Sequence, residues 1–239
     1  MTVTESKSET QVKGLNTFKM LLLPFIALTA VSIALYLFDP LVSVLAYSVG
    51  ALCFIVGIYL VSKNNQQSGH GLKLFLLFLF AILFDLIVGV LTTLNPFSLN
   101  VASSYQAIAS QLGTINHDFG FNVYPIAGMV LFSGIFMVLG GLSFSDWASD
   151  TINLHEDFKT FSYFGWIFLV GEIIIFSGYT VYVAALNEII AGVHGTNTEA
   201  ISFALNIVYV GVFFLLVSMV VEAVAGFQLF KHLNKASTS

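Results

Sequence analysis

Six long apolar runs divide the chain, and shorter polar stretches separate them. The runs cover residues 18–38, 41–62, 72–95, 123–143, 161–186 and 201–229. Each is long enough to cross the hydrocarbon core of a bilayer, which takes about 20 residues of α-helix. A helix also satisfies its own backbone hydrogen bonds, as a segment surrounded by lipid must. The pattern predicts an all-α fold, a polytopic membrane helix bundle of about six transmembrane helices within residues 18–231.

The longest connection between the apolar runs covers residues 96–122. Within it Val101, Tyr105, Ile108 and Leu112 recur at the spacing of one helix face, with serine and glutamine between them. This spacing predicts a short helix lying flat at the membrane surface. A loop packed against the ends of the spans is the alternative, and the pattern does not decide between the two.

Lysine placement predicts the orientation of the bundle. The first, third and fifth connections contain no lysine, and six spans put all the lysines on one face of the membrane. By the positive-inside rule that face is cytoplasmic. We therefore expect residues 1–17 to be a mobile polar cytoplasmic tail and residues 232–239 to be a second one. The lysines are Lys7, Lys13, Lys19, Lys63, Lys73, Lys159, Lys231 and Lys235.

Composition agrees with a lipid environment and excludes several classes of function. Hydrophobic residues make up 57% of the 239-residue chain and charged residues only 9%, whereas soluble proteins carry about 25% charged residues. The lipid bilayer is therefore the expected partner. The net charge of −5 and the absence of a basic cluster in the sequence argue against nucleic acid as a partner. We found no nucleotide-binding, metalloprotease or hydrolase motif, so the sequence assigns no catalytic residue, no metal ligand and no cofactor.

Three carboxylic acids lie inside the apolar runs. Counted from the flanking lysines, Asp85, Glu172 and Glu222 are about 18, 20 and 14 Å deep at 1.5 Å per residue. They are thus predicted to form one layer near the middle of the bilayer. An ionised acid there costs about 2.5–3.5 kcal/mol, and no lysine or histidine lies at this depth to pair with it. Either the acids are protonated, or they hold a cation or face water.

Polar neighbours suggest which faces of these helices point inward. Thr92 lies two turns after Asp85, Tyr179 lies two turns after Glu172, and Ser218 lies one turn before Glu222. A network of carboxyl and hydroxyl groups along the third, fifth and sixth spans is therefore predicted. It would hold the bundle, or a partner subunit, in register. The alternatives are a proton or cation pathway and a binding pocket of unknown kind.

A stripe of small residues runs along the second span. Ala46, Gly50, Cys53 and Gly57 share one helical face. Because lipid tails give helices no hydrophobic drive to pair, small residues matter by letting two backbones approach closely. We interpret this stripe as a helix-packing face. Cys53 is the single cysteine, so no disulfide can form within the chain.

A resemblance adds an expectation about the source. The stretch IAGMVLFSGIFMVLGGLSFSDWASDTINLHEDFKTFSYFGWIFLVGEIIIFSG contains a helix, a polar connection ending in a Phe-Lys pair, and a second helix with spaced glycines. It resembles uncharacterised archaeal families of multi-spanning membrane proteins. The resemblance implies a prokaryotic plasma membrane, and it assigns no activity and no site residue.

Together these features favour a non-catalytic multi-pass membrane protein. It would either act alone or be an accessory subunit of a membrane complex, in contact with other membrane subunits or with further copies of itself. The alternative function is that of a small proton- or cation-linked transporter or channel that uses the mid-membrane carboxylates.

Overall fold

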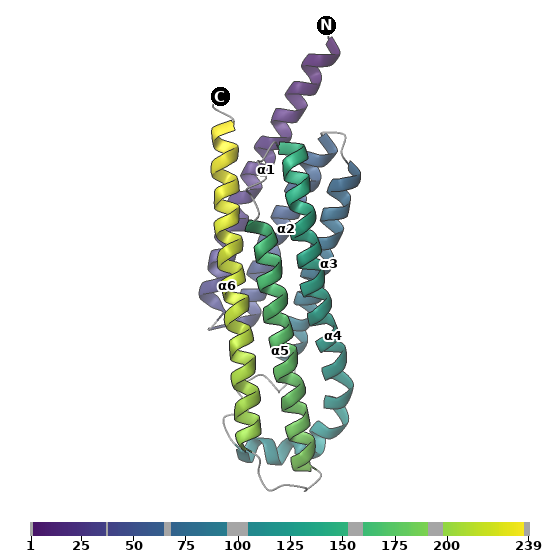
Figure 1. Ribbon diagram of the computed structural model, residues 1–239, viewed down its shortest axis with the longest axis vertical. Helices are drawn as coiled ribbons and strands as arrows, with labels where there is room; N and C mark the ends of the chain where they lie inside the picture. The colour runs from purple at the N-terminus through teal and green to yellow at the C-terminus, as the bar shows by residue number, and fades with distance from the viewer. Residues whose placement is uncertain are drawn as a thin grey trace.

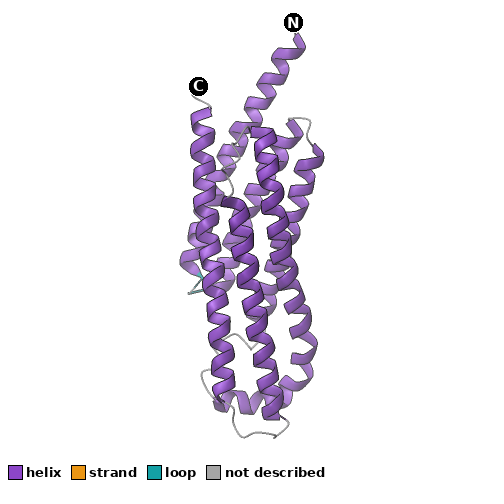
Figure 2. Cartoon of the chain, viewed as in Figure 1, coloured by secondary structure: helices purple, strands orange, loops and turns teal. Residues whose placement is uncertain are grey.

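The computed structural model describes residues 2–36, 38–64, 68–94, 105–152, 160–190 and 198–236. Side chains are described for 14–36, 38–39, 41–64, 69–88, 128–152, 160–185 apart from 179 and 183, and 199–235. Within these residues the secondary structure is α-helical (Figure 2), and each of the six helices is long and apolar enough to span a membrane. The predicted all-α fold with six spans is therefore confirmed. The helices are α1 (Thr2–Leu35), α2 (Pro40–Asn64), α3 (Ser68–Leu94), α4 (Tyr105–Ile152), α5 (Thr160–Ile190) and α6 (Thr198–Ala236).

The six helices run up and down and form a closed ring. Each helix packs against its neighbours in sequence, and α1 packs against α6 to close the ring. Both ends of the chain consequently lie at the same end of the bundle (Figure 1). The ends of α2 and α4 and the starts of α3 and α5 lie at this end too, which we call the lysine end because it carries Lys19, Lys63, Lys73 and Lys231.

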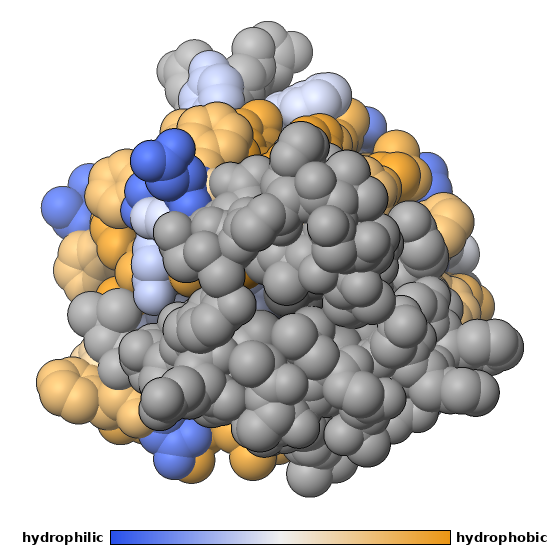
Figure 3. Space-filling view, turned by 90° about the horizontal axis from the view of Figure 1, so that it is seen from below, coloured by the Kyte–Doolittle hydropathy of each residue, from blue (hydrophilic) through white to orange (hydrophobic). Residues whose placement is uncertain are grey.

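The outer surface of the ring is hydrophobic. On α2 the exposed side chains include Val42, Leu45, Val49, Leu52 and Val56, which follow one helical face. The other five helices carry similar exposed apolar residues, and hydrophobic side chains dominate the described margin of the bundle seen from the end opposite the lysines (Figure 3). Contiguous apolar faces of this size are not stable in water. They are the faces that contact lipid.

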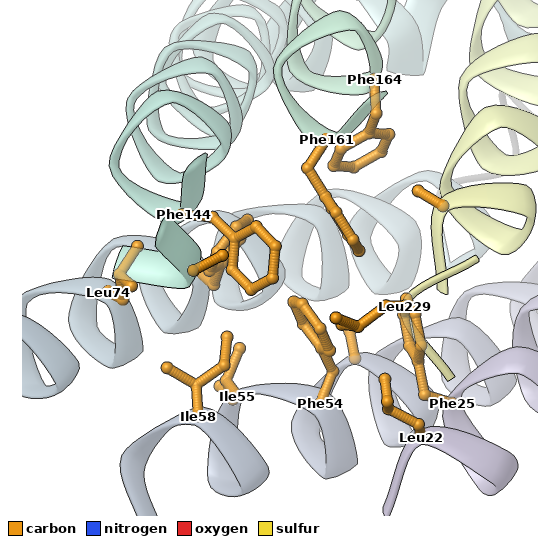
Figure 4. Packing of buried hydrophobic residues seen from close by; sticks show 14 of the residues in the cluster. Leu22, Phe25, Phe54, Ile55, Ile58, Leu74, Phe144, Phe161, Phe164 and Leu229 are labelled. Atoms are coloured by element: carbon orange, nitrogen blue, oxygen red, sulfur yellow. The ribbon is translucent and has the colours of Figure 1, made fainter. Parts of the chain in front are cut away.

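An aromatic layer fills the interior near the lysine end. Phe54 of α2 stacks on Phe25 of α1 with a centroid distance of 4.7 Å and on Phe161 of α5 at 5.1 Å. It also contacts Phe144 of α4 at 5.4 Å and Phe78 of α3 at 6.0 Å. Figure 4 shows Phe25, Phe54, Phe144 and Phe161 pointing toward one another. We call these five rings the aromatic layer, and they join five of the six helices.

Glycines allow close approach of the backbones around the ring. A Cβ atom on Gly165 of α5 would lie 2.7 Å from the Met137 carbonyl oxygen of α4, and one on Gly141 of α4 would lie 2.5 Å from the Phe161 carbonyl oxygen. Between α5 and α6, a Cβ on Gly211 would lie 2.8 Å from the Gly171 carbonyl oxygen. Because backbone cannot yield as a flexible side chain can, these sites require glycine.

A tight hairpin joins α1 to α2. Asp39 caps α2, since its Oδ1 accepts a hydrogen bond of 3.1 Å from the Val42 amide, and Pro40 occupies the first helical position, where a missing N–H is harmless. Ser32 and Ser43 form a reciprocal pair near the turn. Each hydroxyl donates to the other residue's carbonyl oxygen, at 2.9 and 2.8 Å.

Polar side chains also join α2 to α4 near the lysine end. Trp147 Nε1 donates to Ser62 Oγ at 2.7 Å, and both side chains are buried. The Ser62 hydroxyl in turn donates to the Ile58 carbonyl oxygen of its own helix. The only polar atom of the large Trp147 side chain is thereby satisfied in an otherwise apolar interior.

The structure differs from the sequence prediction at the starts of two helices. Residues 1–17 were expected to be a mobile tail, but α1 begins at Thr2. This segment lacks helix breakers apart from Gly14, and Glu9 and Lys13 have the i,i+4 spacing that supports a helix.

Residues 96–122 were expected to hold either a short flat helix or a loop, but α4 already begins at Tyr105. Its first part lies across the end of the bundle opposite the lysines (Figure 1), as the apolar spacing of Ile108 and Leu112 favours. Residues 95–104 lie outside the described part.

Replacing Gly165 by alanine tests the close packing of α4 on α5. The added Cβ meets the α4 backbone, so Gly165→Ala is expected to lower the free energy of unfolding by about 1–3 kcal/mol. Thermal unfolding in detergent, followed by tryptophan fluorescence, measures the change. The matched control is Gly128→Ala, because a Cβ on Gly128 meets nothing within 4 Å. Equal stability of the two variants would contradict the packing.

Candidate functional site: a line of carboxyl groups

The three acids project into the ring from three different helices. Asp85 lies on α3, Glu172 on α5 and Glu222 on α6. Glu172 is 5% exposed and Glu222 is 4% exposed, while Asp85 is partly buried. Asp85 lies close enough to both glutamates for their charges to interact, and it is therefore the middle member of the set.

Asp85 is held by a serine on the neighbouring helix. Ser133 of α4 is fully buried and donates a hydrogen bond of 2.5 Å to Asp85 Oδ1. The Ser133 hydroxyl also lies 3.3 Å from the carbonyl oxygen of Ala81, one turn before Asp85. The contact fixes the rotation of α3 against α4. From the sequence, Ser133 is one of the small residues of the fourth span that are expected to form helix contacts, but the sequence does not pair it with Asp85.

Glu222 faces a tyrosine that the sequence analysis missed. Tyr47 of α2 is 4% exposed, and its hydroxyl interacts electrostatically with the Glu222 carboxyl. The two groups are close enough for a hydrogen-bond-like interaction, but Tyr47 Oη and Glu222 Oε2 are both buried and neither has a partner with regular hydrogen-bond geometry. Thr29 Oγ1 of α1 is a third atom of this kind. A tyrosine at mid-span, away from the membrane interfaces, was the signal for Tyr47.

The acids are staggered along the bundle rather than level. We measure the depth of each acid from the residue of its own helix that lies at the aromatic layer. On α6 this residue is Gly226, which contacts the Phe25 ring. Four residues separate it from Glu222, a distance of about 6 Å along the helix. From Phe78 to Asp85 the step is seven residues, about 10 Å, and from Phe161 to Glu172 it is eleven, about 16 Å. Measured from the aromatic layer, Glu222, Asp85 and Glu172 thus form a line that descends by about 10 Å. We call it the carboxyl line.

This spacing limits what the site can bind. In the part of the chain that the structure describes, no three histidine, cysteine, aspartate or glutamate side chains lie together in a way that could hold a metal ion. The three acids therefore do not act as a single chelating set. Groups that are neighbours in pairs are suited instead to passing a small charge, such as a proton, from one to the next.

The aromatic layer separates the carboxyl line from the lysine end. Phe25, Phe144 and Phe161 are fully buried, and the rings pack at the centroid distances given above. Lys19 lies on the far side of this layer, with its Nζ 6.0 Å from the Phe230 ring centroid. Lys63, Lys73, Lys231 and Lys235 lie near helix ends at the lysine end, so none of the described lysines is placed to neutralise the three acids.

The remaining residues predicted from the sequence have different surroundings. Ser218 is buried on α6, but its hydroxyl donates to the Leu215 carbonyl oxygen of its own helix. The side chains of Thr92 and Tyr179 lie outside the described residues. The predicted network along α3, α5 and α6 thus takes its described hydroxyl partner, Ser133, from α4 instead.

The small-residue stripe of α2 faces α1 through its two glycines. A Cβ on Gly50 would lie 3.3 Å from the Phe25 carbonyl oxygen, and one on Gly57 would meet the Phe18 ring. Cys53 and Ala46 are partly buried. The glycines thereby let α1 approach and bring Thr29 toward the interior.

Comparison of the chain with protein-family models, with curated proteins and with solved structures gave no match.

The hydrogen bond between Ser133 and Asp85 can be tested by its contribution to stability. Ser133→Ala leaves a buried carboxyl without its described partner, so it is expected to lower the free energy of unfolding by about 1 kcal/mol. Ser177→Ala is the matched control, because the Ser177 hydroxyl is exposed and bonds only to the Ile173 carbonyl oxygen of its own helix. Thermal unfolding of the two variants in the same detergent measures the difference. A Ser133→Ala protein as stable as the control would refute the contact.

Proposed function

We propose that this multi-pass membrane protein is a small, non-catalytic transporter or channel that moves protons, or a monovalent cation, along the carboxyl line. The observation that carries the proposal is the position of Asp85 between Glu222 and Glu172, inside the ring and with no described lysine beside it. Acids buried in a membrane domain are costly and are characteristic of proton relays and ion pathways. The stagger of the acids supports a relay, since each acid can exchange a proton with the next.

A second candidate function follows from the hydrogen bond between Asp85 and Ser133. A protonated or hydrogen-bonded acid also holds two helices in register, which is what an accessory subunit of a membrane complex needs. In that case the acids would be structural, and the exposed apolar faces would contact partner subunits or further copies of this chain as well as lipid. Purification in a mild detergent would then recover partners in fixed stoichiometry.

We also propose a location and an orientation. The positive-inside rule supports a cytoplasmic lysine end, with both termini in the cytoplasm. The resemblance to archaeal multi-spanning families supports a prokaryotic, archaeal plasma membrane as its location.

Proton flux tests the proposed transport directly. Purified protein is reconstituted into liposomes that contain a pH-sensitive dye, and a pH gradient is imposed with valinomycin present to balance charge. Wild-type protein is expected to dissipate the gradient faster than protein-free liposomes do. Asp85→Asn is expected to abolish the difference, because the amide can neither gain nor lose a proton at the middle of the line.

Two comparisons make this flux experiment decisive. The control is Asp150→Asn, which removes an exposed carboxyl on α4 near the lysine end and is expected to keep the wild-type rate. The triple variant Asp85→Asn, Glu172→Gln, Glu222→Gln is the second comparison. If it carried protons as fast as wild type, the transport proposal would fail, while recovery of a stoichiometric partner would support the accessory role.

The proposed orientation is tested by labelling single cysteines in sealed vesicles. In a Cys53→Ser background, Asn64→Cys probes the exposed lysine end of α2, and Phe38→Cys probes the α1–α2 hairpin, where Phe38 is 85% exposed. A membrane-impermeant maleimide is expected to label Asn64→Cys only in inside-out vesicles and Phe38→Cys only in right-side-out ones. Labelling of both sites from the same side would overturn the orientation.

A further inference from the structure

Three buried polar atoms without a hydrogen-bond partner come from three different helices. They are Thr29 Oγ1 of α1, Tyr47 Oη of α2 and Glu222 Oε2 of α6. The three residues are at most 4% exposed. Buried hydroxyl and carboxyl groups are nearly always hydrogen-bonded in native proteins, to protein or to ordered water. These three atoms therefore need a partner that the described residues do not provide.

The register of the helices puts the three residues at one level. Phe25 of α1 contacts both Gly50 of α2 and Gly226 of α6. Thr29 is one helical turn beyond Phe25, and Glu222 is one turn from Gly226 in the same direction, away from the lysine end. Tyr47 is three residues from Gly50, again in that direction. The three residues thus lie at one level directly beneath the aromatic layer, on α1 and on the two helices that pack against it, α2 and α6.

The mutual geometry of Tyr47 and Glu222 indicates the size of the missing partner. Their side chains are near enough to interact, yet no hydrogen bond joins them directly. A buried polar pair whose direct contact falls short of regular hydrogen-bond geometry is a setting in which a water bridges the two groups. Thr29 adds a third oxygen, and a buried water typically makes about three hydrogen bonds.

We propose that one water molecule is bound between α1, α2 and α6 by Thr29 Oγ1, Tyr47 Oη and Glu222 Oε2. A metal cation fits less well, because hard cations such as Ca²⁺ and Mg²⁺ take about six or more oxygen ligands, and the neighbouring helical carbonyls are engaged within their own helices. The water gives each of the three groups a partner and ties α1 and α2 to α6. This inference stands apart from the proposed transport, because the bound water is needed whether or not Glu222 carries protons.

Removing single hydroxyl groups distinguishes a bound water from three truly unpartnered atoms. Tyr47→Phe and Thr29→Val keep the shape of the side chain and delete only its polar function. If the water is present, each variant loses a hydrogen bond and leaves the other groups poorly satisfied. The unfolding temperature in detergent is then expected to fall by about 2–4 °C for each variant. If no water is bound, deleting an unpartnered hydroxyl leaves the unfolding temperature unchanged or raises it, and the proposal is overturned.

Further variants separate this site from general effects. Tyr163→Phe is the control, since Tyr163 is 60% exposed on α5, and it is expected to match wild type. Glu222→Gln retains groups that can hydrogen-bond the water and is expected to stay close to the wild-type unfolding temperature, whereas Glu222→Leu is expected to lose stability as Tyr47→Phe does. An equal loss for Gln and Leu would overturn the bridging role.

Two more measurements complete the test. Unfolding temperatures in sodium, potassium and choline chloride are expected to agree. A rise in the unfolding temperature in only one metal salt would show that this cation, and not water, occupies the site. A high-resolution experimental structure should show a peak within hydrogen-bond distance of all three oxygens. Because these readouts do not involve flux, failure of proton transport would leave the water site standing, and failure of the water site would leave transport to be judged by the liposome experiment.

Discussion

The packing of Phe54 is the interaction on which the ring depends. In a bilayer, the apolar surface of a helix is as well solvated by lipid tails as by another helix, so association relies on close contact and on hydrogen bonds. Phe54 supplies such contact at the centre of the bundle, where its ring meets aromatic rings from α1, α3, α4 and α5. The sixth helix joins through Gly226, which lies against the Phe25 ring. One side chain of α2 therefore sets how far apart the other helices stand.

The aromatic layer and the carboxyl line divide the interior into two chemically different parts. Toward the lysine end the interior is filled by rings that exclude water and ions. Beyond it each helix contributes a polar side chain, among them Thr29 of α1, Ser133 of α4 and Glu222 of α6. A charge that left this polar region toward the lysine end would have to cross the rings, which requires the helices to move. In the described conformation that direction is closed.

The apolar runs were sufficient to predict the fold because each span needs about 20 hydrophobic residues, and that requirement is visible in any sequence. The starts of two helices were harder to predict from the sequence. The polar beginning of α1 and the segment after Tyr105 are helical, but neither is apolar enough to be recognised by its hydrophobicity. The acids were visible as charges in hydrocarbon. Their partners Ser133 and Tyr47 were not, because which residue meets Asp85 or Glu222 depends on how neighbouring helices rotate and tilt, and a single sequence does not contain that information.

The helices of this ring differ greatly in length, and the surrounding lipid has to respond. The apolar run of α2 covers residues 41–62, about 33 Å of helix, whereas that of α6 covers residues 201–229, about 44 Å. The α1–α2 hairpin correspondingly ends part-way along the bundle (Figure 1). A membrane of uniform thickness cannot match both sides of such a molecule. Lipids beside the hairpin are compressed relative to those beside α6, so the protein imposes a thickness gradient around its circumference and favours neighbours that relieve it.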